Sequence, residues 1–112
     1  MITIEGLKEY GADVEQGLAR CMNKEDFYLK LVEKAVKDPA FESLRTAVEA
    51  DDKEGAFEAA HRLKGALGNL ALTPLSEPVY EMVELLRNKT EADYTLYLEK
   101  IETKKKLLEE MI

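Results

Sequence analysis

The residues with the clearest chemical potential lie in a short run near the middle of the chain. His61 is the only histidine among the 112 residues, and Lys64 and Gly65 follow it at spacings of three and four. Residues at these spacings are neighbours on the surface of an α-helix. Imidazole is a good nucleophile that is largely neutral near pH 7, and an ammonium group beside it can balance an incoming phosphoryl group. The run therefore places a nucleophilic side chain beside a cation on one helix face.

The helix that carries this run is expected to span about residues 53–70, with Asp52 as its N-cap. At ~100° per residue, His61 lies roughly 140° from the centre of the apolar stripe, and Gly65 lies roughly 180° from it. Both residues should face solvent, with Gly68 on the same outer side. The stripe has steps of four, three, four and three, which is the pattern of a helix packed in a bundle, and comprises Ala56, Ala60, Leu63, Leu67 and Leu70.

A glycine on the solvent face of a helix needs an explanation, because it destabilises the helix by ~1 kcal/mol relative to alanine. Gly65 leaves the imidazole of His61 open from one side, which favours a surface on which a partner docks closely. Phe57, one turn earlier, is expected to lie partly in the core and partly at the edge of this surface. Arg62 can assist only indirectly, since adjacent residues do not face each other. Gly68 has an alternative interpretation as the C′ glycine that ends the helix.

The N-terminal part of the chain is expected to form two short helices and one long helix. Thr3 and Asp13 are the expected caps of the short helices, the first of which ends at Gly11. The long helix is expected to open at Asn23 and to be interrupted at Asp38-Pro39, because proline prefers the first turn of a new helix. Its expected apolar face comprises Phe27, Leu31, Val32 and Ala35, and the continuation after the break carries Phe41, Leu44 and Val48.

Two further helices are expected after the central one. The first starts either at Pro74, in which case Pro78 removes a helical hydrogen bond and kinks it, or at Glu77 with Ser76 as its cap. The sequence leaves both starts open. The last helix is expected to begin at Thr90. The apolar stripes of these helices comprise Leu75, Val79, Met82 and Leu86 in one, and Tyr94, Leu98, Ile101, Leu108 and Ile112, interrupted by Lys105, in the other.

Composition narrows the class of protein. A net charge of −7, from 16 basic and 23 acidic side chains, argues against a nucleic-acid partner. The chain has no apolar run long enough to span a membrane and no signal peptide, and its single cysteine fits a reducing compartment. A cytoplasmic location is therefore expected. With one histidine and one cysteine, a metal site or a nucleophilic hydrolase is disfavoured.

The expected fold class is all-α: an antiparallel up-down-up-down four-helix bundle with short additional N-terminal helices. No alternating β-branched run or hairpin turn predicts a strand. There is no linker or repeat, so residues 1–112 are expected to form a single domain whose bundle core covers about residues 24–112.

The run from Ala60 to Leu70 resembles the His-x-Leu-Lys-Gly signature of histidine-containing phosphotransfer (Hpt) domains. The length, helix order and acidic composition of the chain are similar to that family as well. The resemblance implies that His61 is the phosphoacceptor, that Lys64 is its charge partner and that Gly65 admits the partner protein. It also implies a carrier of phosphoryl groups between aspartates of receiver domains in a two-component phosphorelay.

The resemblance further implies that this chain has no kinase activity, no nucleotide site and no cofactor of its own. A receiver domain would supply Mg²⁺ and most of the catalytic groups, and a hybrid or other histidine kinase would act upstream. Phe57, Arg62, Gly68 and Asn69 are the further residues expected to contact the partner. The chain departs from the family at Ala71, where members often have glycine, and this affects the turn more than the chemistry.

Two alternatives remain open at this point. The bundle could bind a receiver or kinase partner without carrying phosphate, or it could be a module of a larger hybrid or chemotaxis-type kinase. The start at Met1 and the absence of a linker remnant favour a free-standing protein. An isolated exposed site needs no dimer, so a monomer is expected. The identity of the cognate kinase and receivers and the direction of phosphoryl flow do not follow from the sequence.

Overall fold

The computed structural model describes residues 1–112 and contains seven α-helices and no strand, so the all-helical prediction is confirmed. Their bounds follow the expected punctuation closely, with breaks at Gly11, Pro39 and the Asp51-Asp52 pair. In chain order the helices are α1 (Ile4–Tyr10), α2 (Val14–Arg20), α3 (Glu25–Val36), α4 (Ala40–Glu49), α5 (Lys53–Asn69), α6 (Thr73–Arg87) and α7 (Tyr94–Glu109).

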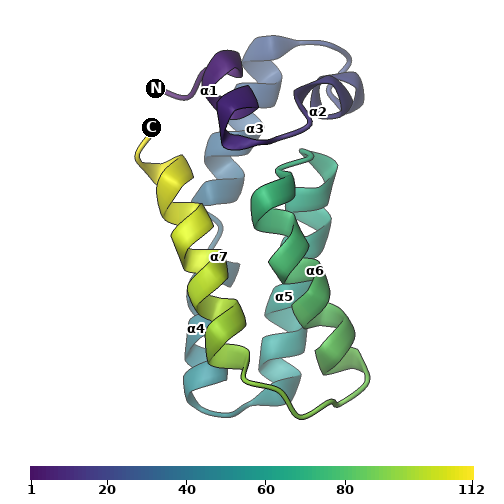
Figure 1. The fold of residues 1–112 in the computed structure, drawn as a ribbon. Helices are drawn as coiled ribbons and strands as arrows, with labels where there is room; N and C mark the ends of the chain where they lie inside the picture. Colours follow the sequence, from purple (N-terminus) through teal and green to yellow (C-terminus); the bar gives the residue numbers. More distant parts are fainter.

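Four of the helices form a closed group (Figure 1). Helix α5 packs against α4 and α6, and α7 packs against the same two helices from the other side. The connections between consecutive members lie at alternating ends of the group (Figure 1). Helix α3 precedes α4 and lies beyond its N-terminal end, while α1 and α2 cover the end of the group where α5 finishes (Figure 1). The molecule is consequently elongated, with extents of 40 × 24 × 20 Å.

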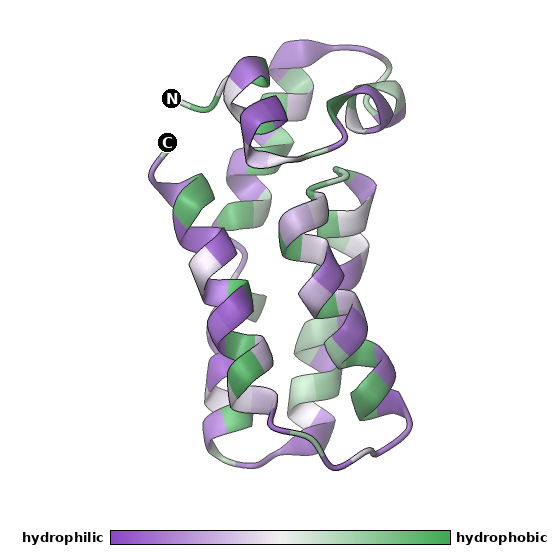
Figure 2. Ribbon diagram, in the orientation of Figure 1, coloured by the Kyte–Doolittle hydropathy of each residue, from purple (hydrophilic) through white to green (hydrophobic).

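The core is a single cluster of 27 buried hydrophobic residues, and no polar or charged residue is buried. Each long helix carries both hydrophobic and hydrophilic segments along its length (Figure 2). The five predicted stripe residues of α5 are all buried, the most exposed of them, Leu70, at 6%. This confirms which face of α5 is turned inward and leaves the opposite face for solvent.

The start of α3 differs from the prediction. Lys24, and not Asn23, precedes its first residue, Glu25. Asn23 has a positive φ of 57° and belongs to the turn after α2. The expected core residue Phe27 is 45% exposed, and its neighbour Tyr28 is fully buried instead. Val32 and Ala35 are buried as predicted. At the start of the helix Tyr28 takes the place of Phe27, and its hydroxyl donates a hydrogen bond to the Leu70 carbonyl at the end of α5.

The structure decides between the two expected starts of α6. The helix begins at Thr73, and Pro78 lies inside it. Pro74 occupies the first turn, where the missing N–H has no helical acceptor in any case. The four predicted stripe residues of α6 are all buried.

Helix α7 begins at Tyr94, four residues after the expected opening at Thr90. Its N-cap is Asp93, whose carboxylate accepts a hydrogen bond of 3.2 Å from the Thr95 amide. At the other end, Ile112 is 38% exposed and does not complete the stripe. Lys105, which interrupts the stripe, places its ammonium 4.9 Å from the centre of the Phe41 ring. Its aliphatic stem can therefore cover apolar surface while the charge stays at the rim.

Four helices are followed by a residue that holds a left-handed backbone conformation without being glycine. Met22, Asp51, Ala71 and Lys89 follow the C-caps of α2, α4, α5 and α6, with φ of 56°, 54°, 54° and 53°. Glycine is the usual residue at this C′ position, because other residues place Cβ too close to the backbone there. Each of these helix ends therefore carries local strain that a glycine would relieve.

Replacing Lys89 with glycine is expected to stabilise the domain by about 1 kcal/mol, because Lys89 is exposed and the strain is lost without loss of packing. The closing hydrogen bonds are backbone bonds that the substitution keeps: Lys89 to the Leu86 carbonyl, 3.0 Å, and Thr90 to the Leu85 carbonyl, 2.9 Å. The check is the urea midpoint of unfolding, with Lys89→Ala as the control that removes the same side chain and retains Cβ. Equal midpoints for the two variants would contradict the explanation.

Candidate functional site

His61 lies on the outward face of α5 and is exposed, as its position opposite the buried stripe predicts. The helix begins at the predicted N-cap, since the Asp52 carboxylate accepts a hydrogen bond of 3.0 Å from the Gly55 amide. One turn before His61, Phe57 is partly buried against the core. Its ring centre lies 5.7 Å from that of the imidazole, at an interplanar angle of 37°. Phe57 thus braces one side of the imidazole, and the rest of the ring faces solvent.

The two glycines beyond His61 border empty space. A Cβ built on Gly65 or on Gly68 meets no atom from elsewhere in the chain within 4 Å. The predicted gap beside His61 is therefore present. The alternative interpretation of Gly68 as the C′ residue is wrong, because α5 continues to Asn69, its C-cap is Leu70, and the left-handed residue is Ala71.

The cations around His61 have different partners. Arg62 forms an ion pair of 3.2 Å with Asp38, at the break between α3 and α4. Lys64 takes part in none of the six ion pairs of the molecule. Its ammonium lies 4.4 Å from the centre of the Tyr80 ring on α6. The charge of Lys64 is therefore not paired with a carboxylate. The charge of Arg62 is paired, and its ion pair links α5 to the break between α3 and α4.

Helix α6 contributes two residues that no sequence pattern singled out. The Tyr80 ring contacts the Lys64 ammonium, and the guanidinium of Arg87 lies 5.9 Å from the centre of the Phe57 ring. Arg87 also pairs with Glu84, 3.1 Å away. Tyr80 sits next to the stripe residue Val79, on the flank of α6, but no spacing within one helix shows which side chains meet across two. These contacts become visible only in the packed structure.

The C-terminal end of α5 is closed by residues from the N-terminal segment. The last carbonyls of a helix have no partner within it and need donors from elsewhere. Asp13 donates its amide to the Ala71 carbonyl at 3.0 Å, and Arg20 donates to the Gly68 carbonyl at 2.5 Å. The buried hydroxyl of Tyr28 donates to the carbonyl of Leu70 at 2.9 Å.

Burial is the main cause that raises the pKa of Tyr28 to about 12, with smaller contributions from the nearby acidic groups of Cys21 and Asp13. The phenol therefore stays a hydrogen-bond donor throughout the physiological pH range. It fixes the helix end that follows Gly65 and Gly68, and so the N-terminal helices help to position the face that carries His61.

This anchoring predicts a large response at Gly17 of α2. A Cβ at this position would lie 2.5 Å from the Tyr28 ring and 2.7 Å from the Leu70 carbonyl oxygen. Gly17→Ala is expected to destabilise the domain by about 1–3 kcal/mol, the usual cost of overpacking. Urea unfolding measures the change, and Gly68→Ala is the matched control, expected to stabilise because its Cβ meets open space. A Gly17→Ala domain as stable as the wild type would show that α2 is not held against this helix end.

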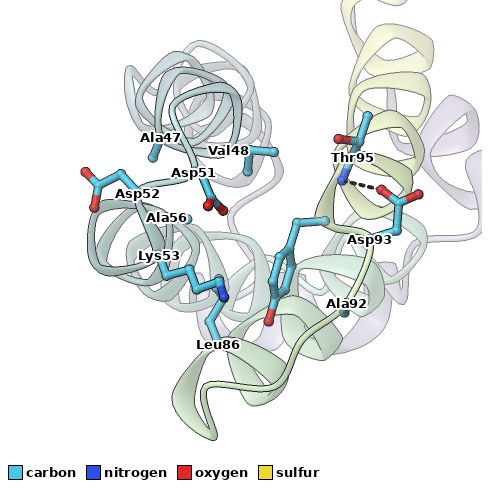
Figure 3. Close-up of a pocket in the computed structure, with 11 residues that line it drawn as sticks. Ala47, Val48, Asp51, Asp52, Lys53, Ala56, Leu86, Ala92, Asp93 and Thr95 are labelled. Carbon is cyan, nitrogen blue, oxygen red and sulfur yellow. Dashed lines mark hydrogen bonds between the residues drawn. The ribbon is translucent and has the colours of Figure 1, made fainter.

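Several hollows indent the surface of the helices. One hollow lies at the N-terminal end of α5, near Asp51 and Lys53 (Figure 3). Its volume is about 160 Å³, and His61 does not line it. A larger hollow of about 630 Å³ lies between α4 and α5 and is lined in part by Pro39, Thr46 and Arg62. A hollow of about 260 Å³ between α3 and α5 is lined in part by Leu31, Lys34 and Asn69. Asn69, predicted to contact the partner, is thus exposed beside α3.

No group of three or more His, Cys, Asp or Glu side chains converges in a way that could hold a metal ion. None of the seven helices is both long enough and apolar enough to cross a membrane.

Comparison with known families identifies the family of the chain. The sequence model of the Hpt domain matches residues 32–112, from the middle of α3 to the end of the chain, and includes all of α5 and α6. The chain belongs to the Hpt domain family. Membership of the family connects this Hpt domain with histidine phosphotransfer in phosphorelays. Helices α1 and α2 and the first half of α3 lie outside the matched residues, and with them Asp13, Arg20 and Tyr28, which close the end of α5. No curated protein and no solved structure matches the chain.

Proposed function

We propose that this Hpt domain carries phosphoryl groups between receiver-domain aspartates and that His61 is the residue that carries them. The observation that supports the proposal is one local arrangement on α5. The only imidazole of the chain is exposed, it lies one turn before a glycine that borders empty space, and a cation without a carboxylate partner lies on the same helix face. Lys64 is the proposed charge partner and Gly65 the proposed point of close approach.

The proposed reaction is an in-line displacement at phosphorus. The ring nitrogen of His61 remote from the backbone, Nε2, attacks the phosphoryl group of a receiver aspartyl phosphate with its lone pair. The new P–N bond forms as the P–O bond to aspartate breaks, and the aspartate carboxylate leaves with the electron pair. The Lys64 ammonium balances part of the charge on the phosphoryl oxygens. The receiver would supply Mg²⁺, and a second receiver would remove the phosphoryl group by the reverse step.

The surroundings of His61 support a docking surface for a protein partner. Phe57, Gly68 and Asn69 are proposed to contact the receiver, since they lie along α5 on either side of His61. Arg62 is proposed at the edge of the same surface, where its ion pair with Asp38 limits its movement. Such a surface needs only one copy of the chain, so we propose that the protein is a monomer. We also propose a cytoplasmic location.

The closed group of α4 to α7 supports the finer architecture as well. We propose that these helices form the antiparallel up-down-up-down four-helix bundle of the family and that the single domain comprises residues 1–112. In this proposal the bundle core covers about residues 24–112. Helix α3 extends the bundle beyond the N-terminal end of α4, and α1 and α2 are added at one end.

The test is incubation of the whole chain with a panel of phosphorylated receiver domains, upstream of which a hybrid or other histidine kinase supplies the phosphate. The expected result is label on this chain that is labile in acid and stable in alkali, as phosphohistidine is. Binding of a receiver without transfer of label would contradict the carrier function and support the alternative, an adaptor that binds a receiver or kinase partner. Acid-stable label would contradict the assignment to histidine.

A further inference from the structure

We propose that Tyr80 on α6 is a positioning residue that holds the Lys64 ammonium for phosphoryl transfer. This inference rests on the proposed function of His61 and Lys64. Its basis is the contact between the two helices: the Lys64 ammonium lies 4.4 Å from the centre of the Tyr80 ring. A cation over the face of an aromatic ring is attracted by the ring quadrupole.

Packing against the core does not account for an aromatic residue at position 80. The side chain is 52% exposed, and it lies on the flank of α6 beside the buried stripe. A large apolar ring at such a position gains little from the core. Its contact with Lys64 is therefore the interaction that distinguishes it from other exposed positions of α6.

An aromatic ring and a carboxylate have different effects on the charge of a cation that they hold. A carboxylate would neutralise the ammonium, as Asp38 does for Arg62 and Glu84 does for Arg87. The Tyr80 ring restrains the long lysine side chain before the phosphoryl group arrives. Less rotamer entropy of Lys64 is then lost when its ammonium meets the phosphoryl group. It does so without adding a negative charge, so the full positive charge of Lys64 remains for the phosphoryl oxygens. Restraint without neutralisation is the requirement for a charge partner that acts only when phosphate arrives.

The experiment compares the rate of phosphoryl transfer from a phosphorylated receiver in four variants: Tyr80→Leu, Tyr80→Phe, Lys64→Ala and the combination of Lys64→Ala with Tyr80→Leu. Tyr80→Leu is expected to slow transfer by about two- to fivefold, the range that corresponds to an exposed cation–π contact. Tyr80→Phe keeps the ring and should transfer as the wild type does. Once Lys64 is alanine, Tyr80→Leu should have no further effect.

The double variant separates positioning from docking. If Tyr80→Leu slows transfer equally with lysine or alanine at position 64, Tyr80 acts on the partner directly and the inference is overturned. If Tyr80→Phe is as slow as Tyr80→Leu, the aromatic ring is not the cause and the inference is overturned as well. Thermal unfolding of each variant checks that the differences do not come from the fold.

A second measurement examines the contact without any transfer. In the unphosphorylated protein, the ε-methylene protons of Lys64 should be shifted upfield by the ring current of Tyr80, and Tyr80→Leu should remove this shift. A Lys64 resonance at its ordinary position in the wild type would overturn the inference. Failure of the wild type to accept phosphate from any receiver would instead overturn the proposed function. Normal transfer by Tyr80→Leu would overturn only the role of Tyr80.

Discussion

His61→Gln is expected to abolish phosphoryl acceptance while the domain stays folded. A glutamine amide is not a nucleophile, and the chain contains no second imidazole that could replace His61. The side chain is exposed on α5 and contributes nothing to the buried core, and glutamine is a slightly better helix former than histidine. The melting temperature of the variant should therefore equal or exceed that of the wild type.

The measurement is the amount of label transferred from a phosphorylated receiver to the variant, together with its thermal unfolding curve. Glu54→Gln is a matched control, because Glu54 is exposed in the first turn of the same helix and is also replaced by an amide. The control should accept phosphate normally. Label that persists on a folded His61→Gln domain would show that another residue is the acceptor.

Gly65→Gln is expected to separate stability from activity. A Cβ at Gly65 meets no atom from elsewhere in the chain within 4 Å, so the longer side chain has room in the free protein. Replacing a glycine inside a helix removes up to about 1 kcal/mol of destabilisation, and the variant should unfold at a higher urea concentration. The side chain would then occupy the space through which a receiver reaches His61. A displacement of about 1 Å between reacting groups can lower a rate on the order of a hundredfold, which is the expected loss of transfer.

Gly65→Ala and Gly68→Ala provide the graded comparison. Both remove a glycine that borders empty space, so both should stabilise the helix to a similar extent. The alanine at Gly65 should slow transfer less than glutamine does, and the alanine at Gly68, further from His61, should slow it least. Gly65→Gln that transfers phosphate at the wild-type rate would mean that the gap beside His61 has no part in docking.

The parts of the fold that depend on local chemistry followed from the sequence. The side chains of Thr3, Asp13 and Asp52 each accept a capping hydrogen bond from the backbone amide three residues later, as their type and position predicted. The stripe of α5 also follows from a local periodicity, and with it the exposure of His61. The outward position of Gly65 needed no knowledge of any other helix.

The remaining features depend on contacts between distant segments. Tyr28, and not Phe27, is buried in α3 because its hydroxyl reaches the Leu70 carbonyl, 42 residues away in sequence. The pairing of Lys64 with Tyr80 depends on the register of α5 against α6. The end of α5 could not be read from glycine signals, because Gly68 lies inside the helix and Ala71 takes the left-handed conformation.

The most direct test of the central claim is nuclear magnetic resonance of the whole chain labelled with ¹⁵N in histidine, since the label then reports a single imidazole. After addition of a phosphorylated receiver, the Nε2 resonance of His61 is predicted to shift and to show coupling to ³¹P. Unchanged His61 nitrogen resonances in the presence of a receiver that loses its phosphoryl group to this chain would contradict the account.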